Sequence, residues 1–137
     1  MTDTILILTD IGFSKRDYQR MGIDILQKKF KVEVFDFTNL FSPNFYKTSE
    51  ENTYRYENYY EMKSLEEAYR SIETRKVFLA IDWLGVSDNS VKLREFLRTK
   101  KIKLLFYQNG LVPNIKRTFY EKCHKAFFLF FKDNKKF

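Results

Sequence analysis

Two aspartates that directly follow apolar runs, Asp10 and Asp82, are the acidic residues best placed to do chemistry. Asp10 opens a segment that continues through a glycine, Gly12, to two basic residues, Lys15 and Arg16. Many α/β proteins bind a phosphate group at a strand-to-helix turn of this kind. The segment therefore raises the hypothesis of a nucleotide site.

The turn itself lacks the residues that grip a pyrophosphate. The dinucleotide fingerprint needs three glycines, for a tight turn, for close backbone approach and for helix packing. Here Gly12 stands alone between the bulky Ile11 and Phe13, and the Gly-Lys-Ser/Thr ending of a phosphate loop is absent. Asp10 would repel a phosphate, although the basic residues of the first helical turn could attract one. We therefore predict that this turn binds no pyrophosphate.

Two other uses of the aspartates have weak support. A phospho-accepting receiver domain needs an acidic pair after its first strand and a lysine after its last strand. In this sequence Ile11 follows Asp10, and the last predicted strand ends at Asn109. Asp10 and Asp82 could alternatively form an acid/base pair, but carboxylates at strand ends are often turn formers. With no nearby histidine and no Gly-x-Ser-x-Gly nucleophile elbow, no catalytic residue is assigned.

Composition limits the class of protein. The chain has 137 residues, 44% of them hydrophobic and 18% aromatic, which is enough for one globular domain with its own core. A single cysteine, Cys123, and a single histidine, His124, argue against a disulfide and a zinc site, so we expect no metal and no cofactor. No apolar stretch reaches the roughly 18 residues of a membrane-spanning helix, and no signal peptide is evident. We therefore expect a cytoplasmic location.

Apolar periodicity predicts strands that alternate with helices. Strands are expected at residues 5–8, 31–36, 77–81 and 102–107, with a short edge strand near 58–63. Helices are expected from Ser14 to near Phe30, from Ser64 to about Arg75, and after residues 87–89, whereas Ser42-Pro43-Asn44 is interpreted as a turn. The pattern predicts a single α/β domain with a doubly wound, largely parallel sheet and helices on both faces, as in Rossmann-like folds.

Ligands of such sheets bind beyond the carboxyl ends of the strands, near the switch in strand order. The substrate-binding residues are expected there: Asp10, Gly12, Lys15, Arg16, Asp82, Trp83, Asn109 and Gly110. Gly22 is expected on the buried face of the first helix, where it would let the helix approach the sheet closely. Leucine at this position would then overpack the core, and alanine would be tolerated.

The charge of the chain is asymmetric. Its formal net charge is +7, and residues 90–137 carry 13 Lys and Arg against 3 Asp and Glu. Residues 114–137 are predicted to form a basic, Phe-rich helical segment, although the AFFLFF run at 126–131 is also consistent with a strand. Three interpretations of this segment remain open: it binds an anionic membrane surface, it packs on a protein core, or its basic side chains form a solvated face. The residues expected to contact an anion or a membrane are Lys116, Arg117, Lys122 and Lys125.

The order of elements resembles the N-terminal half of GT-B-type glycosyltransferases, in particular bacterial surface-polysaccharide biosynthesis proteins. The resemblance covers roughly residues 4–113 and is carried by ILILTDIGFSKRDYQRMGIDIL, KVEVFDFTNLFSP, YYEMKSLEEAYRSI, VFLAIDWLG and IKLLFYQNGLVP. It implies an acceptor-side Rossmann-like domain at residues 1–113, followed by the basic segment 114–137. The chain would then be either a stand-alone domain or a fragment in which this segment leads into a second domain that holds the nucleotide-sugar. The implied partners are a sugar or lipid-linked acceptor and that second domain. The implied location is cytoplasmic, peripheral at the inner membrane face, and the isolated chain is expected to be inactive.

A second hypothesis is a non-catalytic binding or regulatory module with a Rossmann-like fold. Its partner would be an anionic ligand, or a nucleic acid bound by the basic C-terminal half and by exposed tyrosines. However, most tyrosines lie in the acidic half of the chain, and no basic–aromatic motif of a known RNA-binding module is present. Nucleic acid is therefore the less favoured partner.

Overall fold

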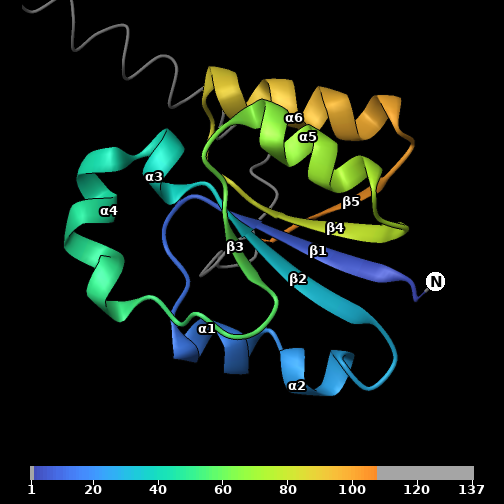
Figure 1. Cartoon of the computed structure of the whole chain (residues 1–137), viewed down its shortest axis with the longest axis horizontal. Coiled ribbons are helices and arrows are strands. Elements are labelled where there is room, and N and C mark those ends of the chain that lie inside the picture. The colour runs from blue at the N-terminus through green and yellow to red at the C-terminus, as the bar shows by residue number, and fades with distance from the viewer. Residues whose placement is uncertain (1, 108–137) are drawn as a thin grey trace, which may run out of the picture. The chain divides into compact units, whose positions relative to one another are not determined.

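Five parallel strands form the sheet of the computed structural model, which describes residues 2–107. The strands are β1 (Thr4–Thr9), β2 (Lys31–Asp36), β3 (Tyr59–Glu61), β4 (Val77–Trp83) and β5 (Lys103–Phe106). Their order across the sheet is β3-β2-β1-β4-β5, and every neighbouring pair is parallel. The predicted Rossmann-like α/β fold is confirmed (Figure 1).

β1 lies at the centre of the sheet, as its sequence indicates. All of its residues are buried, which is typical of an aliphatic strand covered on both faces. Ile7 of β1 is level with Val34 of β2 on one side and with Ile81 of β4 on the other. The chain moves outward from β1 through β2 to β3 and then crosses over to β4 and β5. The strand order therefore switches between β1 and β4.

Helices cover both faces of the sheet (Figure 1). On one face lie α1 (Lys15–Arg20) and α2 (Ile23–Leu26), and on the other lie α5 (Leu65–Glu73) and α6 (Asp88–Thr99). The core beneath α1 and α2 consists of Ile5, Ile7, Phe13, Ile23, Val32, Val34 and Trp83. The opposite core includes Leu6, Leu8, Phe35, Ala68, Ile72, Leu93 and Leu97. Successive strand residues point to opposite faces, so the continuous apolar run of β1 contributes to both cores.

Serine caps fix the starts of α1 and α5. Ser14 accepts a hydrogen bond from the Asp17 amide, and the Asp17 carboxylate accepts one from the Ser14 amide, which together form a capping box. At α5, Ser64 accepts a hydrogen bond from the Glu67 amide, as predicted. The Glu67 carboxylate, however, accepts from the Lys63 amide at 2.8 Å.

The prediction of a single helix from Ser14 to Phe30 is wrong, because the structure has two short helices there. The break lies at Gly22, whose φ of +62° is in the left-handed region. Gly22 does not contact the sheet, since a Cβ at this position would meet only the Ile25 side chain, at 4.0 Å. Ile25, in the second of the two helices, is 64% exposed. A left-handed glycine interrupts a helix without changing the apolar period, so the sequence pattern did not reveal it.

The segment after β2 is more helical than expected. Ser42-Pro43-Asn44, interpreted as a turn, contains the start of α4 (Pro43–Ser49), with the proline at a first-turn position. A short helix, α3 (Thr38–Phe41), precedes it, and a 3-10 turn, η1 (Glu50–Asn52), follows it. The predicted edge strand is present as β3, and β4 continues beyond residue 81 to Trp83.

Replacing Gly22 with alanine or with leucine is expected to destabilise the fold by similar amounts, about 1 kcal/mol. The loss arises from holding an L-residue at φ +62°, because the surrounding space admits either side chain. Asparagine tolerates the left-handed region better and should cost less. Denaturant unfolding of the three variants measures these free energies. A leucine variant several-fold more destabilised than the alanine variant would restore the buried-face interpretation.

Candidate functional site

The carboxyl ends of the strands meet at one edge of the sheet, beside α3 and α4 (Figure 1). At the switch between β1 and β4 the loops are residues 10–14 and 84–87. The Gly85 amide of the second loop donates to the Asp10 Oδ2 atom of the first, at 3.0 Å. A Cβ at Gly85 would lie 3.3 Å from the same oxygen, so glycine permits this close approach. The two loops are therefore joined where a ligand of this fold class binds.

Asp10 is buried at this junction, with 7% of the residue exposed. Its Oδ1 atom is also buried but has no hydrogen-bond partner. Burial raises the pKa of the Asp10 carboxyl above its ordinary value of 3.8, and the Gly85 hydrogen bond partly opposes that rise. A buried acceptor without a donor is unfavourable. The Oδ1 atom therefore lacks the compensation that Oδ2 receives from the Gly85 amide.

Three amide groups of the turn after β1 donate hydrogen bonds within the protein. Their hydrogen bonds run from Gly12 to Thr38 Oγ1 (2.7 Å), from Ile11 to Thr9 Oγ1 (3.4 Å) and from Ser14 to the Asp17 carboxylate (2.9 Å). A phosphate-binding turn instead presents such amides to its ligand. This hydrogen bonding takes three amide donors of the turn away from a pyrophosphate.

Asp36, at the end of β2, accepts hydrogen bonds at both of its oxygens. Oδ1 accepts from the amide (2.7 Å) and the hydroxyl of Thr38, and Oδ2 accepts from the hydroxyl of Tyr59 in β3. Burial and the hydrogen bond to Asp36 both raise the pKa of Tyr59. Because Thr38 Oγ1 also accepts from the Gly12 amide, one chain of hydrogen bonds links the ends of β1, β2 and β3.

Asp82, in β4, is held by Arg94 of α6. The Arg94 Nε atom lies 2.6 Å from Asp82 Oδ2, and Nη2 lies 3.2 Å from Oδ1, which also accepts from the Leu84 amide at 3.1 Å. Arg94 Nη2 donates to the carbonyls of Leu84 (2.9 Å) and Gly85 (3.3 Å) as well. The bidentate pair therefore fixes the loop that binds Asp10.

The structure brings only some of the predicted site residues together. Asp10 and Gly12 lie in the first loop, across from Asp82 and Trp83 at the end of β4. Trp83 is 8% exposed because it packs in the core against Tyr107, with ring centroids 5.6 Å apart. The predicted residues on α1, Lys15 and Arg16, are exposed. The remaining predictions lie outside the described residues: Asn109, Gly110, Lys116, Arg117, Lys122, Lys125 and the helical segment 114–137.

The sequence places Asp36-Phe37-Thr38 at this edge, whereas two residues that position it, Gly85 and Arg94, were not predicted as part of the site. The Asp36-x-Thr38 spacing is typical of an Asx turn and was a usable signal. Arg94 lies 12 residues from Asp82, a separation that carries no local signature. Exposed apolar side chains also border the site, namely Ile11, Phe45 and Val86. Phe45 of α4 lies 3.9 Å from the position that a Gly12 Cβ would occupy.

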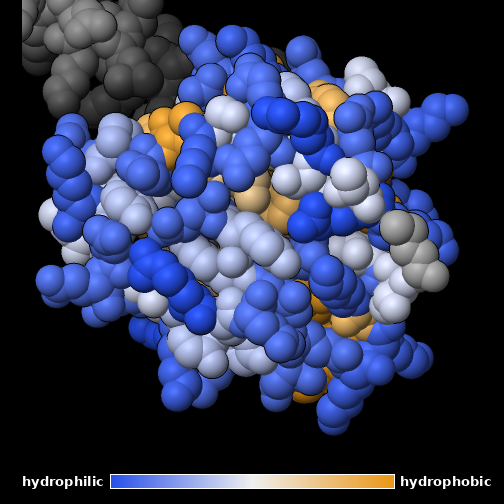
Figure 2. Space-filling view, in the orientation of Figure 1, coloured by the Kyte–Doolittle hydropathy of each residue, from blue (hydrophilic) through white to orange (hydrophobic). Residues whose placement is uncertain are grey.

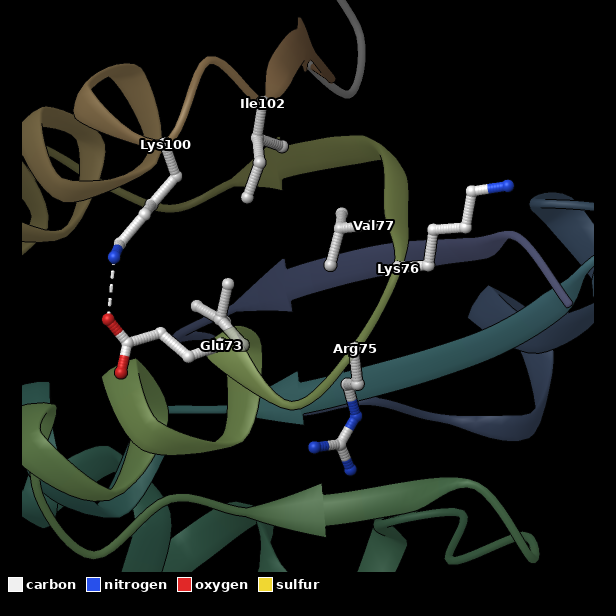
Figure 3. A pocket seen from close by; sticks show the side chains of 7 residues that line it. Glu73, Arg75, Lys76, Val77, Lys100 and Ile102 are labelled. Carbon is white, nitrogen blue, oxygen red and sulfur yellow. Dashed lines mark hydrogen bonds and ion pairs between the residues drawn. The ribbon is translucent and has the colours of Figure 1, made fainter. Parts of the chain in front are cut away.

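Hollows occur at both edges of the sheet. A pocket of about 150 Å³ at the carboxyl edge is lined by Asn39, Leu40, Met62 and Lys63. A pocket of about 430 Å³ lies at the opposite edge, among the ends of α5 and α6 and the start of β4 (Figure 3). Residues 2–107 contain no group of three or more His, Cys, Asp or Glu side chains that could hold a metal ion. In this same range no helix is long and apolar enough to cross a membrane.

No protein-family model matches the chain, and no curated protein or solved structure matches it significantly. The geometry of the carboxyl edge is therefore the basis for assigning a function. Its distinguishing feature is that Asp36 and Asp82 are fully engaged, whereas Asp10 retains a buried oxygen without a donor.

Replacing Arg94 with methionine is expected to lower the free energy of unfolding by about 3–5 kcal/mol, because the buried Asp82 carboxylate loses its cation. The double variant Asp82→Asn/Arg94→Met removes the uncompensated charge and should recover part of this loss. Denaturant unfolding of both variants measures the difference. Equal destabilisation of the single and double variants would contradict a role for the charge of Asp82.

Replacing Asp10 with asparagine is expected to change how stability depends on pH. Burial raises the Asp10 pKa above 3.8 in the folded state, so the folded protein binds this proton more tightly than the unfolded chain does. The native carboxyl thus stabilises the fold at low pH and loses that contribution as the pH rises through the raised pKa. The Asp10→Asn variant has no ionisable group at this position, so its stability does not fall in this way as the pH rises.

The free energy of unfolding of Asp10→Asn, relative to the native protein, should therefore increase between about pH 4 and pH 7. Urea titrations at several pH values across this range measure the difference. A difference that stays constant with pH would contradict the burial of an ionisable Asp10.

Proposed function

We propose that this chain provides the acceptor-side domain of a GT-B-like glycosyltransferase of polysaccharide biosynthesis, and that a hydroxyl of the acceptor binds at Asp10. The proposal depends chiefly on one observation, the buried Asp10 Oδ1 atom at the β1–β4 switch that lacks a hydrogen-bond donor. A sugar hydroxyl is a neutral donor, and its bond to a carboxylate is stronger than a bond between two neutral groups. The proposed setting is the cytoplasm, at the inner membrane face.

The turn after β1 favours a neutral ligand over a phosphorylated one. Its amides donate to Thr38, Thr9 and Asp17, and the adjacent Asp10 carboxylate repels a phosphate. The nucleotide-sugar donor would accordingly be held by a second domain rather than at this edge. The exposed apolar side chains of Ile11, Phe45 and Val86 complement the apolar face of a sugar ring or of its aglycone.

In glycosyl transfer the acceptor oxygen bonds to the anomeric carbon of the nucleotide-sugar, while the bond from that carbon to the phosphate oxygen breaks and the nucleotide leaves with the electron pair. The reaction therefore also needs a group that takes the proton of the attacking hydroxyl. A carboxylate with a pKa raised by burial is better suited to this task than an exposed one. Asp36 and Asp82 offer no equivalent group, because their oxygens already accept hydrogen bonds. In this proposal Asp10 therefore both orients the acceptor hydroxyl and receives its proton.

The proposal predicts that the full chain binds neutral saccharides and does not bind NAD, ATP or nucleotide-sugars. Saturation-transfer NMR with a panel of neutral oligosaccharides would identify a ligand, and titration would give its affinity. Asp10→Asn should weaken binding about tenfold or more, because a charge-assisted hydrogen bond is lost. Asp24→Asn, which changes an exposed aspartate of α2, is the matched control and should bind as the native chain does.

Calorimetry with the nucleotides provides the opposing test. Micromolar binding of any of them to the native chain would overturn the acceptor-side assignment. An equal loss of saccharide binding in the Asp10 and Asp24 variants would remove Asp10 from the site.

A further inference from the structure

The edge of the sheet opposite the candidate site, where the parallel strands begin, is rich in exposed lysines. Parallel pairing brings distant loops together there, since Lys31 of β2 and Val77 of β4 are both level with Thr4 of β1. The lysines on these loops and strand starts are all exposed, and we call them the amino-edge lysines: Lys28, Lys29, Lys31, Lys76, Lys100, Lys101 and Lys103.

Carboxylates offset only part of this charge. Lys76 pairs with Asp3 at 2.7 Å, Lys100 pairs with Glu73 at 2.6 Å, and Lys31 lies 2.6 Å from the buried Glu33. Within residues 2–107, the other amino-edge lysines form no ion pair. The edge therefore presents unneutralised ammonium groups from the loops before β2 and β5.

An exposed phenylalanine lies among these lysines. Phe78, near the start of β4, is 47% exposed, and its ring stacks on Phe30 with centroids 5.5 Å apart. The Lys103 Nζ atom lies 5.8 Å from the Phe78 centroid. An exposed aromatic ring beside an ammonium group suits a membrane interface, where the ring enters the apolar boundary and the ammonium group stays with the phosphates.

The pocket of about 430 Å³ opens at the same edge (Figure 3). Val77 and Ile102 contribute apolar side chains to it, and Figure 3 shows the Lys76 ammonium pointing away from both of them. The Lys100 side chain instead turns toward Glu73. The pocket therefore combines the apolar side chains of Ile72, Val77 and Ile102 with charged side chains at the amino edge.

We infer that the amino edge binds an anionic phospholipid surface through the amino-edge lysines and Phe78. The exposed cations here are mainly lysines, which act on lipid phosphates as point charges. A single-stranded nucleic acid would instead need successive exposed aromatic rings for base stacking, whereas Phe78 already stacks on Phe30. The face seen in Figure 2 is mostly hydrophilic, with apolar residues in small separate patches. This inference does not rest on the carbohydrate proposal, because it concerns the opposite edge.

Co-sedimentation of the full chain with vesicles tests the inference. The chain should bind phosphatidylcholine vesicles that contain about one third phosphatidylglycerol and should not bind pure phosphatidylcholine. Each lysine near an anionic surface contributes about fivefold to partitioning, so Lys29→Gln/Lys101→Gln should weaken binding about 20- to 30-fold. Lys47→Gln/Lys63→Gln removes the same charge from exposed positions outside the amino edge and should leave binding nearly unchanged.

High salt and the Phe78→Ala variant separate the electrostatic contribution of the lysines to binding from the apolar contribution of Phe78. High salt should remove the lysine-dependent part of binding, and Phe78→Ala should remove the part that survives high salt. Equal losses in the two lysine pairs would overturn the inference, because the position of the charge would then have no effect. Failure of the native chain to bind anionic vesicles would also overturn it, as would steeply salt-dependent binding to single-stranded RNA without vesicle binding.

Discussion

The arrangement of this domain depends on how it stabilises negative charge at the ends of parallel strands. A parallel sheet gathers the carboxyl ends of its strands at one edge, and here Asp10, Asp36 and Asp82 are all buried there. A buried carboxylate is costly unless hydrogen bonds or a cation compensate it. The loops around this edge therefore adopt the conformations that deliver a hydroxyl, an amide or a guanidinium group to each carboxylate.

These compensating groups also make the edge rigid. Thr38 connects Asp36 to the Gly12 amide, and Arg94 connects Asp82 to the loop at Gly85. The same principle operates within β2, where the fully buried Glu33 binds Arg75 from the segment after α5. Arg75 in turn lies over the Phe35 ring, at 5.2 Å. Asp10 is held by the Gly85 amide at Oδ2, whereas its buried Oδ1 atom has no hydrogen-bond partner.

The strands and the serine caps could be predicted because their signals are local. A continuous aliphatic run such as β1 and a Ser14–Asp17 spacing carry their meaning within a few residues. The break at Gly22 could not be predicted, because backbone handedness leaves the apolar period unchanged. The sequence placed Asp10 and Asp82 equally well at strand ends. The sequence could not show that both oxygens of Asp82 accept hydrogen bonds whereas Oδ1 of Asp10 accepts none. That difference depends on Arg94, which reaches Asp82 from a different element.

The position of Trp83 has a practical consequence for spectroscopy. It is the single tryptophan of the chain, buried at the end of β4 between the residue that pairs with Arg94 and the loop that contacts Asp10. All indole fluorescence of this protein therefore originates from one ring, whose environment includes the Tyr107 edge. Emission wavelength and quenching report on the carboxyl edge alone, so a ligand that shifts the 84–85 loop and the unfolding of the sheet can both be followed without an added label.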